Sequence, residues 1–261
     1  LFKVMSDMLY ELRDGHVNLI SGFDRSRNWD WKLDYPENFD FSIIQRNYLG
    51  DDYRITGPLY NTVIDSVGYI YYPSFGSDVS EGQIDYLIDK FYNMKGIIID
   101  VRNNGGGSSA NAEVIATRFA DQKILAAKYL YKNGPEHDDF APAKDFFLEP
   151  RGNKAFLKPV VVLTNRSCYS ATNYFVLLMR SLPQVTILGD KTGGGGGIPI
   201  YSELSNGWRF RFSASITLAP DGFNVEHGIE PDIYQDMTDD DLINNTDSIL
   251  EKALEIIKNQ N

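Results

Sequence analysis

Hydrophobic positions along the chain follow two different periods, and these mark the expected elements. Continuous apolar runs of strand length predict buried strands at 67–75, 96–101, 124–131, 160–164 and 185–188. Apolar residues at helical spacing predict helices at 1–12, 80–92 and 111–119, a helix that begins close to Ser170, and a C-terminal helix capped at 246–248. This alternation predicts an α/β fold whose parallel or mixed sheet is covered by helices on both faces.

Other regions carry weaker patterns. A short strand is expected at 16–20, and alternation at 208–217 predicts a strand hairpin. Residues 134–154 are expected to form an acidic loop or lid, and 21–60 are irregular apart from a short helix near 41–48. We therefore divide the chain into a small helical and irregular N-terminal appendage, residues 1–60, and a main α/β domain, residues 61–261.

Composition narrows the function classes. With 261 residues, of which 43% are hydrophobic, the chain can bury a large core. The net charge of −11 and the lack of a Lys/Arg cluster argue against a nucleic-acid partner. No apolar stretch approaches the roughly 18 residues of a membrane span. The single cysteine, Cys168, excludes an internal disulfide framework and a cysteine-based zinc cage.

The turn after the strand at 160–164 is the first candidate for chemistry. Ser170 stands where a strand gives way to a helix, and the free N–H groups of a first helical turn stabilise negative charge there. Serine is also a favoured helix cap, and Ser167 is the better candidate for that role. The nucleophile-elbow pattern G-x-S-x-G is absent around both serines, which argues against a plain α/β-hydrolase.

Two glycine-rich turns could bind anions. The turn at 105–107 follows the strand at 96–101 and can present bare backbone N–H groups, with Asp100 and Arg102 expected to lock it. Its G-x-G-x-x-A match lacks the acidic residue that a dinucleotide site needs after the next strand. The run at 193–197 lacks the phosphate-loop spacing and is interpreted as a mobile or substrate-lining loop. No cofactor or metal is therefore expected.

Four segments in order resemble serine peptidase family 41, which holds the carboxyl-terminal processing (tail-specific) proteases and the catalytic core of tricorn protease. The segments are 12–17 (L-x-D-x-H), 100–107 (D-x-R-x-N-x-G-G), 167–172 with 189–193 (S-A-S-A-S-E, then G-x-x-T), and 226–232 (E-x-G-I-x-P-D). The resemblance implies a ClpP/crotonase-like mixed sheet flanked by helices. It also implies a serine endopeptidase that acts on peptides or unfolded proteins, and export to a periplasm or cell surface.

Site residues carry over by position. The resemblance implies Ser170 as the nucleophile, His16 as the base and Glu226 as the group that orients the imidazole. It places the oxyanion hole at the backbone N–H groups of Ala171 and Gly106, with Gly105 as an alternative to Gly106.

Two departures from the family pattern select a branch. The glutamate that follows the serine motif is Asn173 here, and the lysine base of tail-specific members falls on Gly195. The chain therefore resembles the tricorn-like Ser–His–Glu branch. The segment between 20 and 66 is too short for a PDZ domain.

Three other functions stay open at this point. A catalytically inactive relative could hold peptides or small apolar ligands in the same cleft. A crotonase-like acyl-CoA enzyme would share the oxyanion hole, although no Lys/Arg cluster supports CoA binding. A thiol enzyme would use Cys168, which lies two positions before the matched nucleophile. The sequence predicts no oligomeric state.

Overall fold

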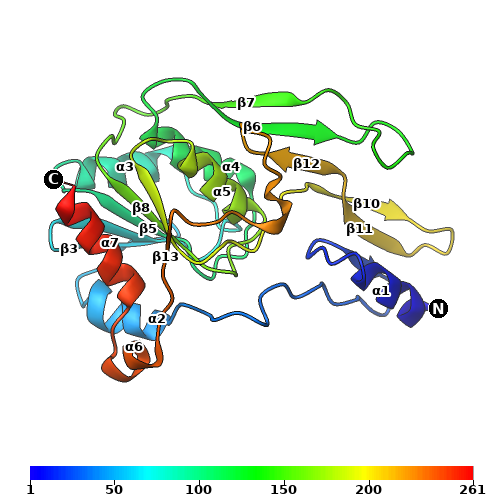
Figure 1. Cartoon of the computed structure of the whole chain (residues 1–261), viewed down its shortest axis with the longest axis horizontal. Coiled ribbons are helices and arrows are strands. Elements are labelled where there is room, and N and C mark those ends of the chain that lie inside the picture. The colour runs from blue at the N-terminus through cyan, green and yellow to red at the C-terminus, as the bar shows by residue number, and fades with distance from the viewer. Residues whose placement is uncertain (261) are drawn as a thin grey trace.

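A seven-stranded mixed sheet forms the centre of the molecule (Figure 1). The computed structural model describes residues 1–260. The strand order is β13-β9-β8-β5-β4-β3-β2, in which the first five run parallel and the last two pair antiparallel. The strands are β2 (Arg54–Thr56), β3 (Leu59–Ile64), β4 (Val67–Tyr71), β5 (Ile97–Asp100), β8 (Val160–Thr164), β9 (Val185–Gly189) and β13 (Ile233–Tyr234).

Helices cover both faces of this sheet, which confirms the predicted α/β architecture. One face carries α3 (Glu81–Phe91), α4 (Ser109–Ala116, continued by the 3₁₀ turn Thr117–Phe119) and α5 (Ala171–Arg180). The other carries α7 (Ser248–Asn259), α2 (Phe41–Ile43) and a π-helical turn (Ile44–Leu49); α6 (Asp239–Asn244) precedes α7. Within β5, Ile97 and Ile99 pack toward α5 while Ile98 packs toward α7. The strand is therefore apolar throughout because both of its faces are buried.

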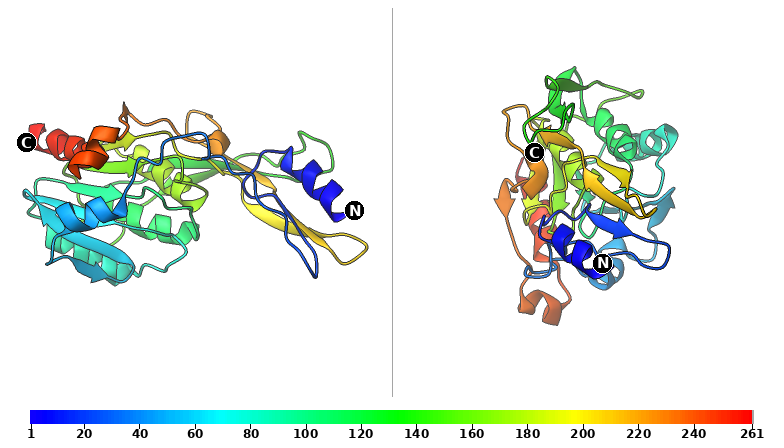
Figure 2. Two further views of the ribbon diagram at one scale, coloured as in Figure 1. Left: turned by 90° about the horizontal axis from the view of Figure 1, so that it is seen from below. Right: turned by 90° about the vertical axis from the view of Figure 1, so that its right-hand side faces the viewer.

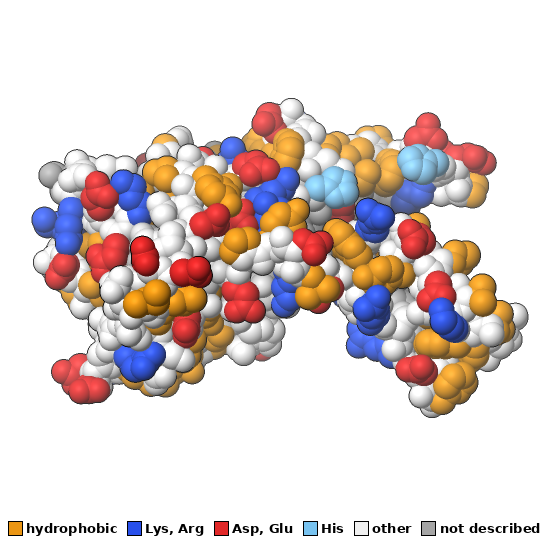
Figure 3. All heavy atoms as spheres, turned by 60° about the horizontal axis from the view of Figure 1, so that its bottom comes forward, with side chains coloured by type: hydrophobic (Ala, Val, Ile, Leu, Met, Phe, Trp, Pro, Cys, Tyr) orange, Lys and Arg blue, Asp and Glu red, His pale blue; other side chains and the backbone are white. Residues whose placement is uncertain are grey.

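Two three-stranded sheets project from one end of this body (Figure 2). One has the order β12-β6-β7, and the other β1-β11-β10. Their strands are β1 (Asn18–Ile20), β6 (Ile124–Tyr131), β7 (Lys144–Leu148), β10 (Pro199–Glu203), β11 (Arg209–Ser213) and β12 (Ser215–Leu218). The helix α1 (Phe2–Tyr10) lies beside the second sheet, where Phe2 contacts Trp208. Figure 3 shows a notch between the body and the lower right-hand projection.

The structure corrects the predicted hairpin at 208–217. Its two strands do not pair with each other: β11 pairs with β10 and β1, whereas β12 pairs with β6 in the other sheet. Alternation identifies a strand but carries no information on its partner. Part of the predicted loop at 134–154 is also a strand, β7, whose exposed and charged residues mask its period.

The predicted boundary at residue 60 falls inside β3. The strand β2, in the segment predicted to be irregular, also belongs to the central sheet. Residue 261, the end of the predicted main domain, lies outside the described residues. Within the segment 1–53, β1 joins the sheet β1-β11-β10 and α1 lies beside that sheet, whereas α2 packs on the body.

Candidate active site

Ser170 occupies a strained turn between β8 and α5. Its backbone has φ 57° and ψ −119°, a combination that residues other than glycine seldom adopt. The Ser170 N–H donates to the Gly194 carbonyl at 2.8 Å, and the side chain makes no helix-capping bond. The hydroxyl is therefore free for another role. The serine occupies this turn although the G-x-S-x-G pattern is missing. The room for its side chain comes from Gly106 on a neighbouring loop, where an added Cβ would lie 2.9 Å from Ser170 Cβ.

His16 reaches Ser170 from the far end of the sequence. Its Nε2 lies 3.0 Å from Ser170 Oγ, and the residue is 4% exposed. The pairing of β1 with β11 fixes the segment that follows it. Burial lowers the pKa of His16 to about 4, with Asp14 opposing and Arg211 adding to this shift. The imidazole is therefore neutral near pH 7 and able to accept a proton.

Glu226 lies at the other side of the loop at 193–197. Its Oε2 accepts a hydrogen bond from the Gly197 N–H at 2.9 Å. Burial and the neighbouring Asp14 charge raise the pKa of Glu226 to about 7. Within residues 1–260 Glu226 forms no hydrogen bond or ion pair with His16. The structure thus brings Ser170 and His16 together, but no hydrogen bond or ion pair among residues 1–260 joins Glu226 to His16.

The two predicted oxyanion donors lie beside Ser170, and they differ in whether the backbone N–H already has an acceptor. A Cβ on Gly106 would lie 3.0 Å from the Ala171 nitrogen, so the two backbones are in contact. The Gly106 N–H donates to Asn104 Oδ1 at 3.0 Å. The Ala171 N–H, at the start of α5, has no acceptor among residues 1–260.

Sequence reasoning missed three residues that complete the site. Asp14 Oδ1 lies 3.8 Å from His16 Nδ1. The Tyr169 hydroxyl donates to Asp14 Oδ1 at 3.3 Å, and the Ser213 hydroxyl donates to Asp14 Oδ2 at 2.8 Å. Asp14 stands within the 12–17 segment and could have been noted there. Ser213 belongs to no motif. The pairing of β1 with β11 brings it near Asp14, and the sequence does not show that pairing.

A comparison with protein families covers most of the chain. Residues 66–235 match the model of peptidase family S41. The chain belongs to peptidase family S41. The matched residues include Gly106, Ser170 and Glu226, whereas His16 precedes them.

Two related proteins match parts of this chain. A probable CtpA-like serine protease of Staphylococcus haemolyticus is 28% identical over 171 residues, which are 64% of this chain and 33% of the relative. The tricorn protease of Thermoplasma volcanium is 29% identical over 201 residues, 73% of this chain and 17% of that protein. The chain therefore spans a third or less of the length of these two relatives.

Solved structures confirm the fold. A "putative peptidase from Parabacteroides merdae" is 47% identical with a TM-score of 0.93, and the match covers 98% of this chain and 82% of that one. Mature CPAF in complex with lactacystin shares the fold at 16% identity and a TM-score of 0.64, with 82% and 59% covered. The S41 fold expected from the motifs is thus the observed one.

The lysine that resemblance to tail-specific members would place at position 195 has no room there. At Gly195, where that lysine would stand, φ is 76° and a Cβ would lie 2.4 Å from the Tyr169 ring. Tyr169 stacks on Trp31 with ring centroids 3.7 Å apart, so it cannot move aside easily. Lys191, the nearest lysine in sequence, instead pairs with Glu230 at 2.9 Å. The space for a lysine base is filled by a tyrosine.

Gly195→Ala is accordingly expected to destabilise the protein by about 2–3 kcal/mol, because it combines an unfavourable φ with a clash against a fixed ring. Gly207→Ala is the matched control: its φ is 80° with nothing within 4 Å of an added Cβ, so only about 1 kcal/mol is expected. Urea unfolding of both variants measures the difference. Equal losses would show that the Tyr169 ring does not fill this space.

The pocket beside Ser170 is small and mainly apolar. It has a volume of about 150 Å³, and it is bordered by Ala171, Tyr129, Tyr174, Ile198 and Val225, among others. An apolar cavity of about this size holds a benzene molecule in other proteins. The pocket can therefore hold one side chain of similar bulk from a bound ligand.

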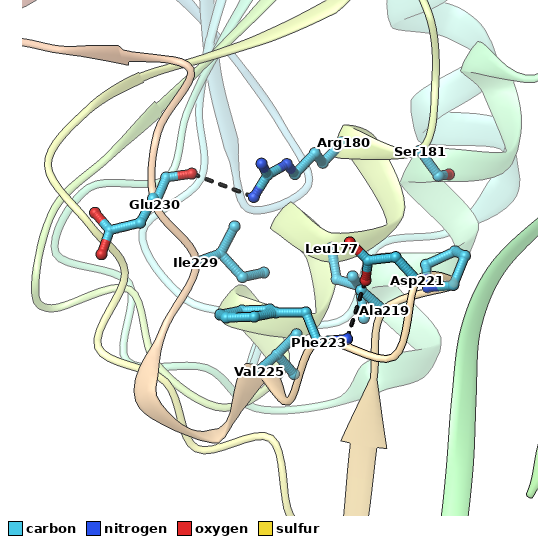
Figure 4. Close-up of a pocket in the computed structure, with 10 residues that line it drawn as sticks. Leu177, Arg180, Ser181, Ala219, Asp221, Phe223, Val225, Ile229 and Glu230 are labelled. Carbon is cyan, nitrogen blue, oxygen red and sulfur yellow. Dashed lines mark hydrogen bonds between the residues drawn. The ribbon is translucent and has the colours of Figure 1, made fainter.

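A second hollow, of about 410 Å³, lies at the C-terminal end of α5 (Figure 4). Phe223, Ile229 and Leu177 line it, while Arg180 at its rim donates to the Glu230 carbonyl at 3.4 Å. It shares Val225 with the Ser170 pocket but holds neither Ser170 nor His16.

Proposed function

We propose that this chain is the catalytic part of a serine peptidase that hydrolyses peptide bonds in peptides or unfolded proteins. The observation that carries the proposal is the 3.0 Å approach of His16 Nε2 to Ser170 Oγ in a partly buried site that borders a pocket. His16 takes the hydroxyl proton as Ser170 Oγ attacks the carbonyl carbon, and returns that proton to the leaving amine. Water then repeats the sequence on the acyl-enzyme.

The oxyanion of the tetrahedral intermediate would be bound by backbone N–H groups. Ala171 offers a free N–H at the positive end of α5, a favourable place for negative charge. Gly106 can contribute once its N–H leaves Asn104 Oδ1. Each such donor contributes roughly 10²- to 10³-fold to kcat.

Glu226 remains the proposed third member of the set, as family resemblance implies. Its bond to the Gly197 N–H supports this role indirectly, because Gly197 borders the pocket that contains Ser170. Asn173 supports the same segment: its Nδ2 donates to the Val225 carbonyl at 3.0 Å.

The decisive experiment compares cleavage of unfolded casein and a peptide library by the full-length protein and its Ser170→Ala variant. Turnover by the wild type that is lost in Ser170→Ala, and kept in Ser167→Ala, is the expected result. Equal, negligible turnover in all three would overturn the proposal. Ligand binding by such an inactive protein, unchanged in Ser170→Ala and His16→Ala, would then favour the binding-module alternative.

The acidic limb of the pH profile of kcat/KM is expected near pH 4 to 5, well below the usual range of histidine. His16 accepts a proton only while neutral, and burial lowers its pKa to about 4 from 6.5. Initial rates at substrate concentrations far below KM measure this limb. A limb near 7 would instead indicate titration of Glu226, whose pKa is raised to about 7.

Export to a periplasm or cell surface is proposed from family resemblance alone. Among residues 1–260, the helices are too short or too polar to cross a membrane. Fractionation of cells that express the full-length protein tests the location; recovery only with the cytosol would contradict it.

A further inference from the structure

The buried nitrogen of His16 that faces away from Ser170 has no hydrogen-bond partner. If Nε2 accepts the Ser170 proton, Nδ1 must carry the other ring proton. Nδ1 is buried and unpaired among residues 1–260. The carboxylate nearest to it is that of Asp14, with Oδ1 at 3.8 Å, and this side chain is 18% exposed. An unpaired buried donor beside a carboxylate is a contact that can tighten when the ring becomes charged.

Asp14 is held in place by three donors from three segments. Oδ1 accepts a hydrogen bond from the backbone N–H of His16 at 2.7 Å and another from the Tyr169 hydroxyl at 3.3 Å. Oδ2 accepts the Ser213 hydroxyl at 2.8 Å. Tyr169 directly precedes the nucleophile, and its ring centroid lies 4.9 Å from that of His16. The carboxylate is therefore fixed relative to both members of the Ser170–His16 pair.

The charges around His16 give Asp14 a distinct influence. Asp14 favours the protonated ring, whereas Arg211 on β11 opposes it. Tyr169 is neutral at working pH because burial raises its pKa. Glu226 accepts the Gly197 N–H and, among residues 1–260, forms no ion pair with His16. Asp14 is thus the negative group best placed to offset an imidazolium at position 16.

We propose that Asp14 is a positioning residue for His16: it fixes the ring through a carboxylate that Tyr169 and Ser213 hold in place, and it offsets the charge that the ring gains from Ser170. This inference rests on the proposed peptidase function and adds to the role of Glu226. No proton passes to Asp14: His16 Nε2 takes the proton from Ser170 Oγ and delivers it to the leaving amine, while Asp14 stays a carboxylate.

Asp14→Asn tests the inference, because asparagine keeps an oxygen for the same donors and removes the charge. We expect a loss of about 10²- to 10⁴-fold in kcat with little change in KM. The acidic limb of kcat/KM is expected to move to lower pH, whereas Arg211→Gln moves it to higher pH. Asp24→Asn, which removes an equal charge from an exposed turn, serves as the charge control.

A second measurement does not depend on turnover. The pKa of His16 is read by NMR titration of its ring Cε1–H, which is assignable because the chain has only three histidines. The titration uses Arg211→Gln with and without Asp14→Asn, since loss of the cation keeps both inflections within the folded range. A lower pKa with Asp14→Asn, and a smaller shift with Glu226→Gln, is expected.

The outcomes separate the two proposals. Wild-type inactivity with the expected NMR shift removes the peptidase function but leaves the electrostatic contact intact. An unmoved His16 pKa, or a larger shift from Glu226→Gln, overturns the role of Asp14 even if the protein is active. If Asp14→Asn fails to fold, Tyr169→Phe and Ser213→Ala replace it: each should lower kcat without raising KM, and unchanged kcat in both would refute the inference.

Discussion

Replacing His16 with alanine is expected to lower kcat by about 10⁶-fold. The loss should be nearly as large as that of Ser170→Ala, and the double variant should be hardly worse than either, because a nucleophile without its base contributes little. The physical basis is the single 3.0 Å contact between the two residues. Steady-state cleavage of a peptide substrate that the wild type turns over measures all three variants.

The matched control for this variant is His137→Ala. His137 is exposed in the segment between β6 and β7 and lies outside the proposed site, so its removal should leave kcat unchanged. Additive losses in the double variant, or an active His16→Ala, would show that His16 and Ser170 do not work as a pair. Circular dichroism verifies that the variants keep the fold.

Arg102→Met is expected to lower the free energy of unfolding by about 3–5 kcal/mol, which corresponds to roughly 10 °C in Tm for a chain of this size. Arg102 is fully buried. Its Nη2 lies 2.6 Å from Asp100 Oδ2 and 2.9 Å from Asp247 Oδ2. Its Nη1 also donates to the Asn38 carbonyl at 3.1 Å. Methionine would leave two buried carboxylates without a counter-charge.

Thermal and urea unfolding measure this loss, with Lys258→Met as the control. Lys258 pairs with Asp65 at 2.9 Å on the surface, where both side chains are well exposed, so its removal should cost less than about 1 kcal/mol. A similar small loss for Arg102→Met would mean that the buried pair is replaced without penalty by an apolar side chain. The printed bonds of Arg102 go to Asp100, Asn38 and Asp247, whereas the Gly106 N–H in the glycine turn donates to Asn104 Oδ1. That Asp100 and Arg102 lock this turn therefore stays a prediction.

Much of the fold could be predicted because its signals are local. The apolar run at 97–99 has buried neighbours on both faces, and Ile97 and Ile98 show this by packing into different cores. The helix α3 begins at a capping box formed by Ser80 and Gln83, which is visible in sequence. The partners of β11 and β12 could not be predicted, since strand pairing depends on segments far away in the chain.

The sequence by itself determined the two cores, the strand-to-helix position of Ser170, and, through the order of four motifs, the candidates His16 and Glu226. Those features depend on residue type and spacing, which are written along the chain. Only the tertiary structure decided that His16 lies 3.0 Å from Ser170 and that Asp14, rather than Glu226, faces its other nitrogen. The reason is that β1 pairs with β11, with Asn18 opposite Arg211. This pairing brings the N-terminal segment next to Ser170. Which carboxylate then meets a given ring nitrogen depends on side-chain packing between segments that are distant in sequence.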